Sequence, residues 1–89
     1  MVEFGEAPAS HSLVGLRVGA CARIVSVAAS SADISAEMLR RLVDLGFRAG
    51  ETVRVIARGP VGGEPIAVRI GTATFALRRQ EAACIGIIA

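Results

Sequence analysis

Apolar residues recur at helical spacing in one stretch of this chain and in alternation through most of the rest. The helical stripe consists of Ile34, Met38, Leu39, Leu42 and Leu45. It predicts one helix that packs on a single side. The helix should end at Gly46, since glycine adopts the positive φ of a C-terminal cap, and Phe47 can then fold back over Leu42. At the other end, Asp33 or Ser35 can cap the first turn.

Alternating or β-branched apolar runs predict five short strands. They are expected at residues 20–27, 51–58, 66–70, 73–78 and 84–88. In the second of them, Val53, Val55 and Ala57 share the face that we expect to be buried. Arg54 and Arg58 then lie on the opposite, exposed face.

Glycine and proline mark the connections between these strands. Residues 59–65 are rich in both, so we expect a loop at a hairpin end there. Gly71 and Thr72 fit a two-residue type II′ turn. Single helical turns are expected at residues 12–16 and 79–83. Five strands with one helix inserted after the first predict a mainly β fold, a small and strongly bent five-stranded barrel.

The 89 residues correspond to one domain. Residues 1–11 are small, polar or acidic and predict a flexible N-terminal tail, which leaves residues 12–89 for the domain. No apolar run approaches the roughly 18 residues of a membrane helix, and the start lacks the features of a signal peptide. We therefore expect a cytoplasmic protein without membrane insertion. Its 53% hydrophobic content predicts apolar surface left for a partner, unless alanine alone inflates the value.

Charge and cysteine usage narrow the function further. The formal net charge is +2, and the arginines are spread along the chain between acidic residues, so we do not expect nucleic-acid binding. Cys21 and Cys84 have no CxxC spacing, and each lies in an apolar run. Both are therefore expected to be small buried thiols in a reducing compartment.

The sequence contains few candidate groups for catalysis or for binding a metal. No nucleophile has a plausible general base, so an enzyme is not expected, and no cofactor is required. His11 is the single histidine and the candidate metal ligand. With Glu3 and Glu6 nearby it could bind a divalent ion such as Fe²⁺ or Zn²⁺ weakly, above all if two chains share the ion. The alternative is a solvated histidine in the tail.

An ordered set of motif residues runs through the predicted domain: Gly19, Leu42, Leu45, Gly46, Gly50, Pro65 and Leu77. Over about residues 13–88, this set resembles the ferrous-iron-transport A family, FeoA, whose members are stand-alone SH3-like barrels. One departure is Ala49, where such sequences commonly have proline before Gly50. A similar barrel is the last domain of metal-dependent repressors, so a metal-responsive regulatory module is the alternative interpretation.

The resemblance implies an accessory protein of bacterial ferrous iron uptake that binds the cytoplasmic, GTP-binding part of the membrane iron transporter and modulates transport. The chain has no Trp or Tyr for an aromatic groove, so proline-rich peptides are not expected ligands. The helix and the 59–65 loop should then contact the partner instead. The expected partner-binding residues are Arg40, Arg41, Asp44, Gly62, Gly63 and Glu64. A homo-oligomer is compatible with the sequence.

Overall fold

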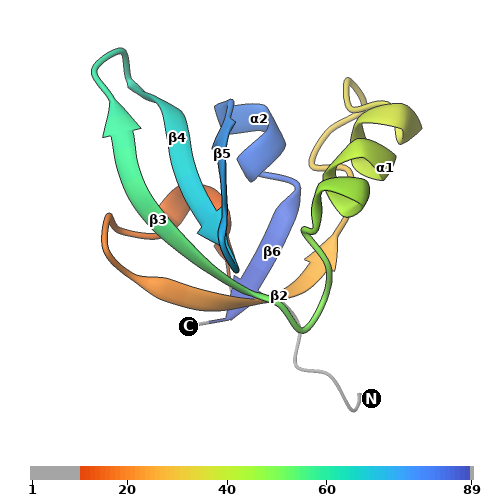
Figure 1. Cartoon of the computed structure of the whole chain (residues 1–89). Coiled ribbons are helices and arrows are strands. Elements are labelled where there is room, and N and C mark those ends of the chain that lie inside the picture. Colours follow the sequence, from red (N-terminus) through yellow and green to blue (C-terminus); the bar gives the residue numbers. More distant parts are fainter. Residues whose placement is uncertain (1–10, 89) are drawn as a thin grey trace.

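One strongly bent antiparallel sheet dominates the computed structural model, which describes residues 11–88 (Figure 1). Its strands, in the order β1-β6-β2-β3-β4-β5, are β1 (His11–Ser12), β6 (Ile85–Ile88), β2 (Cys21–Val27), β3 (Thr52–Gly59), β4 (Gly63–Ile70) and β5 (Ala73–Leu77). The predicted mainly β fold with an inserted helix is confirmed, but the sheet has six strands and not five. The two residues of β1 are too few to show an alternating pattern.

Within residues 11–88, three helical segments accompany the sheet: the 3₁₀ turn η1 (Leu13–Gly15), α1 (Ala36–Leu45) and α2 (Arg79–Ala82). Helix α1 begins where predicted, because Ser35 Oγ accepts a hydrogen bond from the Met38 amide at 3.1 Å. It ends at Gly46, whose φ of 119° is left-handed. Leu42 is buried, but Leu45 is 37% exposed, so the inward stripe stops one turn earlier than expected.

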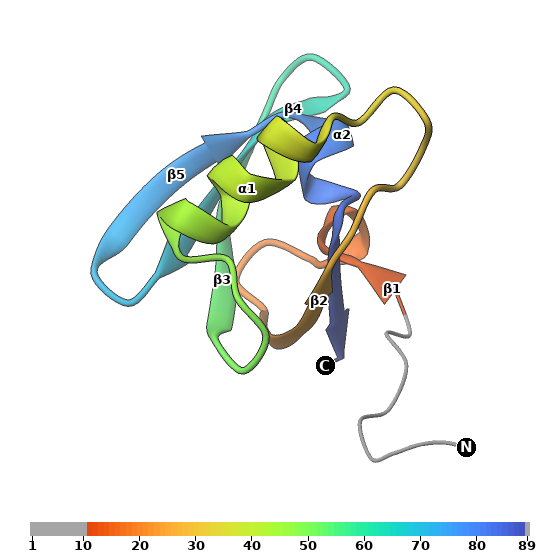
Figure 2. The same cartoon turned by 90° about the vertical axis from the view of Figure 1, so that its right-hand side faces the viewer.

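The core lies between the bent sheet and α1, which Figure 2 shows in front of the sheet. Its largest fully buried side chains are Phe47, Leu13, Ile24, Leu42, Ile66, Ile85, Ile87, Val53, Val55 and Val68. Phe47 does more than cover the helix end, since its side chain is fully buried and its ring centroid lies 5.5 Å from that of Phe75. The predicted inward position of Leu77 is confirmed.

Strand β3 contains a β-bulge that reverses its side-chain alternation. Val55 pairs with Val68 and Ala57 pairs with Ala67, which leaves Ile56 without an opposite residue. Beyond this extra residue the inward and outward positions exchange. Ala57 is therefore exposed, contrary to the prediction from strict alternation, while Arg58 turns inward and is half-buried.

The predicted loop at residues 59–65 is shorter than expected, because β3 continues through Gly59 and β4 begins at Gly63. Pro65 therefore lies inside a strand. The register steps from Arg58 opposite Ile66 to Gly59 opposite Gly63, so Pro65 has no opposite residue on β3 and its missing N–H interrupts no pair there. A Cβ on Gly59 would lie 2.0 Å from the Glu64 carbonyl oxygen, so this close approach requires glycine.

The two cysteines differ in exposure. Cys84 is buried as predicted, and its Sγ donates to the Gln80 carbonyl at 3.3 Å. Cys21 is exposed, which contradicts the prediction. It occupies an outward position of β2, next to the buried Ala22, so its apolar neighbours in sequence point to the other face.

His11, which was predicted to lie in the tail, opens β1 opposite Ile87 and is exposed. Residues 1–10, with Glu3, Glu6 and Phe4, lie outside the described part of the chain. Within the described part, no helix is long and apolar enough to cross a membrane.

Candidate functional site

The outer side of α1 presents the three charged side chains expected to contact a partner. Arg40, Arg41 and Asp44 are all exposed. Arg41 is 71% exposed and its Nη1 lies 3.9 Å from Glu81 Oε2, so it forms a loose ion pair with α2. The Arg40 side chain makes no hydrogen bond or ion pair with any residue in the described range 11–88, and it borders a hollow of about 170 Å³ with Ala36 and Glu37. The side chain of Arg40 is thus more available for contact with a partner than that of Arg41.

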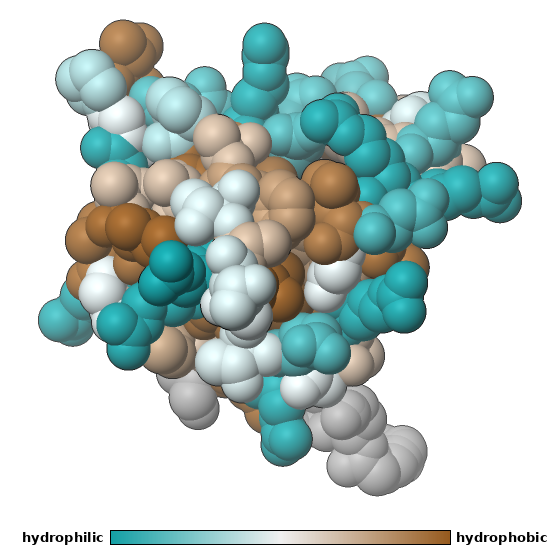
Figure 3. Space-filling model, viewed as in Figure 1, coloured by the Kyte–Doolittle hydropathy of each residue, from teal (hydrophilic) through white to brown (hydrophobic). Residues whose placement is uncertain are grey.

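The tip of the β3–β4 hairpin carries an apolar side chain that is exposed to solvent. Val61 is 79% exposed, and Figure 3 shows apolar atoms standing out at this tip. Gly62 and Gly63 follow it with φ values of 62° and 82°, which suit glycine. A hollow of about 320 Å³ opens beside Val61 and is also lined by Glu64, Pro65 and Arg78. An exposed valine next to a hollow is a typical element of a protein contact.

Glu64 is less available for contact with a partner than the sequence indicated. Its carboxylate accepts a short hydrogen bond from the backbone amide of Arg79 at the start of α2. The side chain of Arg79 then returns to the hairpin, where Nη2 donates to the Gly62 carbonyl at 2.7 Å. Glu64 therefore fixes the hairpin to α2 and does not project as a free contact.

Helix α2 connects the two segments that the sequence had singled out separately. On one side Glu81 pairs with Arg41 of α1, and on the other Arg79 holds Gly62 and Glu64 of the hairpin. In Figure 1 the hairpin tip, α2 and α1 lie along the same upper end of the molecule. We call this region the hairpin–helix surface; it comprises Arg40, Arg41, Asp44, Val61, Gly62, Gly63, Glu64, Arg79 and Glu81.

Sequence reasoning missed Val61, Arg79 and Glu81 as members of this surface. Val61 could have been found, because it is an apolar residue enclosed by glycine and proline in a predicted loop. Arg79 and Glu81 had no such signal. Their role depends on how α2 lies between α1 and the hairpin, which residue spacing does not encode.

Most residues of the predicted motif set are structural. Gly19 has a φ of 90° and its amide donates to the Val55 carbonyl at 2.7 Å, which fixes the entry to β2. Gly50 has a φ of 95° and donates to the Ile24 carbonyl at 2.8 Å, which fixes the start of β3 against β2. Gly19 thus lies in the connection before β2, whereas Gly46 and Gly50 lie in the connection between α1 and β3.

The described residues form no metal-binding group with the predicted ligand, His11. Within residues 11–88, no three His, Cys, Asp or Glu side chains come together in a way that could hold a metal ion. His11 stands exposed on β1, and the acidic residues predicted to accompany it fall outside the described range.

The bent six-stranded sheet with its inserted helix is a small SH3-like β domain. The chain belongs to the FeoA family, because the model of the FeoA domain matches residues 11–88. Curated proteins gave no match.

Solved structures agree with this assignment. FeoA of Stenotrophomonas maltophilia, a prokaryotic SH3 domain protein solved with zinc, is 40% identical and has a TM-score of 0.76; the match covers 89% of this chain and 91% of that one. The FeoA protein of Chlorobium tepidum is 33% identical with a TM-score of 0.73, over 85% of this chain and 67% of its own. A manganese-dependent transcriptional repressor is 26% identical with a TM-score of 0.75, and the match covers 93% of this chain but 43% of the repressor.

Proposed function

We propose that this protein is an accessory factor of bacterial ferrous iron uptake that acts in the cytoplasm by binding, not by catalysis. Its partner is the cytoplasmic, GTP-binding part of the membrane iron transporter, and it modulates transport through this contact. Membership of the FeoA family supports the role in iron transport. The S. maltophilia relative has itself been proposed to activate ferrous iron transport.

The observation that carries this proposal is the hairpin–helix surface. Val61 exposes 79% of its surface at the end of a hairpin that Arg79 and Glu64 hold in place. A fixed apolar tip loses little conformational entropy on binding, so its burial contributes more of its free energy to affinity. Arg40 adds an unpaired guanidinium that can bind a carboxylate on the partner with two hydrogen bonds.

Binding is tested by pull-down with the purified cytoplasmic part of the transporter. Val61→Asp should remove most of the binding, because it places a charge where an apolar contact forms, and Arg40→Glu should weaken it. Ala49→Asp is the matched control, since Ala49 is also an exposed apolar residue but lies in the turn between α1 and β3, outside the hairpin–helix surface. Melting temperatures of all three variants should stay close to that of the wild type.

Transport is tested in a strain that lacks the protein and is complemented with each variant. The wild type and the Ala49 variant should restore ferrous iron uptake, and the Val61 variant should not. Normal uptake in the deletion strain, or full binding by the Val61 variant, would refute this function.

A metal-responsive regulatory module is the second candidate. The likeness to a manganese-dependent repressor over 93% of this chain supports it, as does the zinc in the S. maltophilia structure. Calorimetry with Fe²⁺ and Zn²⁺ on the wild type and on His11→Ala tests it. Stoichiometric heat that the substitution abolishes would support His11 as a ligand of a weakly bound divalent ion; no heat, or unchanged heat, would count against it.

A further inference from the structure

A second surface lies on the outward face of the sheet, where one row of side chains crosses four strands. Cys21 of β2 is opposite Arg54 of β3, Arg54 is opposite Arg69 of β4, and Arg69 is opposite Thr74 of β5. All four residues are exposed. Two like charges directly opposite each other on neighbouring strands are unfavourable, so this pair gains from an anion placed near it.

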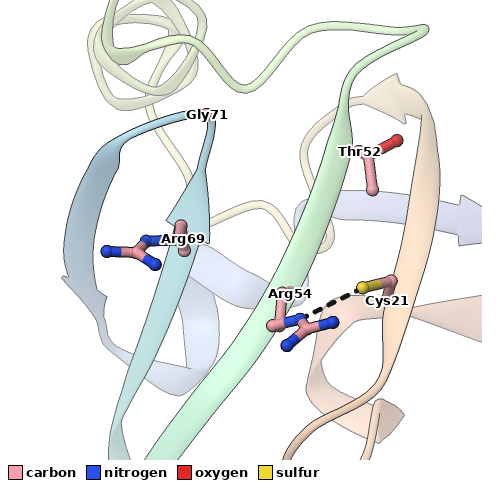
Figure 4. A pocket seen from close by; sticks show the side chains of 5 residues that line it. All are labelled: Cys21, Thr52, Arg54, Arg69 and Gly71. Carbon is pink, nitrogen blue, oxygen red and sulfur yellow. Dashed lines mark hydrogen bonds between the residues drawn. The ribbon is translucent and has the colours of Figure 1, made fainter.

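Neither guanidinium has an acidic partner among residues 11–88. Arg54 Nε donates to Cys21 Sγ at 3.3 Å, and sulfur is only a weak acceptor. Figure 4 shows Arg54 directed toward Cys21 and Arg69 directed away from it. The Arg69 side chain makes no hydrogen bond or ion pair with the described residues. The hydrogen bond to Cys21 raises the pKa of Arg54, so this guanidinium stays charged.

Two adjoining hollows share these arginines. One, of about 270 Å³, is lined by Cys21, Thr52, Arg54, Arg69 and Gly71. The other, of about 490 Å³, is lined by Gly19, Arg54, Val55, Ile56, Arg69 and Thr74. No acidic residue in the range 11–88 lines either hollow. Their local charge is therefore positive although the chain as a whole is nearly neutral.

Apolar side chains border the larger hollow. Ile56 is the extra residue of the β3 bulge and is 39% exposed, and Val18, next to Gly19, is 54% exposed. Figure 3 shows apolar atoms gathered beside β3 and the loop before β2. Bulges commonly redirect a side chain at functional positions, and here the bulge leaves an isoleucine beside two arginines.

We propose that this arginine face, made of Val18, Cys21, Arg54, Ile56, Arg69 and Thr74, docks an acidic segment of a partner protein. Carboxylates of the segment bind Arg54 and Arg69, and an apolar side chain next to them enters the hollow over Val55 and Ile56. A second copy of this chain fits less well, since it would bring arginine against arginine. Single-stranded nucleic acid is disfavoured because, among the described residues, no aromatic ring lines either hollow for base stacking.

The test uses end-blocked peptides of alternating aspartate and leucine, with lysine–leucine and aspartate–serine peptides for comparison. Amide shifts in ¹⁵N spectra should map binding of the aspartate–leucine peptide to the arginine face. The double variant Arg54→Gln, Arg69→Gln should weaken it at least about tenfold, because two charge-assisted contacts are lost. Ile56→Ser should weaken it less, and Arg40→Gln, on the hairpin–helix surface, should leave it unchanged.

Cys21 gives an independent readout at the edge of the same face. The bound aspartate–leucine peptide should slow alkylation of Cys21 by iodoacetamide, with the buried Cys84 as internal reference. Several results would overturn the proposal: no saturable binding, equal binding of the aspartate–serine peptide or of inorganic phosphate, or unchanged binding by the double variant. Concentration-dependent shifts of this face without peptide would also overturn it, in favour of self-association.

Discussion

Arg79 Nη2 donates a hydrogen bond to the Gly62 carbonyl at 2.7 Å, so a side chain of α2 holds the tip of the β3–β4 hairpin. The backbone amide of Arg79 contacts the same hairpin through the carboxylate of Glu64. One residue thus holds the hairpin at two points, Gly62 in the turn and Glu64 on β4. The hairpin is therefore expected to be more ordered than its glycine content suggests.

Arg79→Ala should loosen this tip without unfolding the domain. The side chain is exposed, so the lost contact should cost at most about 1 kcal/mol of global stability. Amide hydrogen exchange at Gly62 and Gly63 should nevertheless become several-fold faster. Arg23→Ala, an exposed arginine on β2, is the control and should leave exchange at the hairpin unchanged. Equal exchange in both variants would show that the side chain does not order the hairpin.

Phe47 should be among the most costly side chains to truncate. It is fully buried and fills the space between the end of α1 and the sheet. Phe47→Ala should lower the free energy of unfolding by about 3–5 kcal/mol, since it removes a large apolar surface and leaves a cavity. Phe75→Ala should cost less, because Phe75 is only partly buried. Urea unfolding of both variants measures the difference, and equal losses would contradict this account of the core.

The fold could be predicted largely because its elements follow local rules. Helix α1 has a clear apolar stripe, a serine cap and a glycine stop, and all three act within a few residues. The predictions were wrong where the structure of one strand depends on its pairing with another. The bulge at Ile56 and the position of Pro65 within β4 follow from the pairing register, and no local pattern specifies that register.

Gly46→Ala tests the predicted helix stop directly. The residue has a φ of 119°, which a side chain with a Cβ adopts only with strain. We expect a loss of about 1–3 kcal/mol in the free energy of unfolding. Gly15→Ala is the matched control, because a Cβ there meets nothing within 4 Å and its φ is not in the strained region. A comparable loss in both variants would assign the cost to something other than backbone strain.

Arg58 should stabilise the segment that leads into β2. Its Nη2 lies 2.5 Å from the Val14 carbonyl oxygen and 2.7 Å from that of Leu16. Arg58→Met keeps the apolar stem but leaves these partly buried acceptors unpaired, which should cost about 1.5–3 kcal/mol in urea unfolding. Arg58→Lys should recover part of this loss, since it restores a cation with a different geometry. No loss on the methionine substitution would show that water replaces the guanidinium fully.

The two thiols should react at very different rates in the native protein. Iodoacetamide should modify the exposed Cys21 readily and the buried Cys84 only after denaturation, which mass spectrometry of the digested protein can follow. Cys21→Ser should then leave almost no native reactivity. Rapid native modification of Cys84 would indicate that β6 and α2 open frequently.

The candidate site could be predicted only in its separate parts. Arg40 and Arg41 were recognisable as exposed charges on a helix, and Gly62 and Gly63 as a turn. That these parts form one surface depends on α2, whose four residues carry no distinctive motif. The availability of Glu64 was misjudged for the same reason, because its hydrogen-bond partner belongs to α2.

Because of the extra residue at position 56, odd-numbered residues of β3 point inward before the bulge and even-numbered residues point inward after it. Before it, Val53 and Val55 point into the core; after it, Arg58 points inward and reaches the carbonyls of η1. Deleting Ile56 would remove only the extra residue, because Ala57 opposite Ala67 and Arg58 opposite Ile66 then continue the alternation that starts at Val55. Arg58 would still point inward and keep its anchor to η1, while the arginine face would lose its apolar border. A length change of one residue here would thus alter the outer face of the sheet and leave the inner contacts in place.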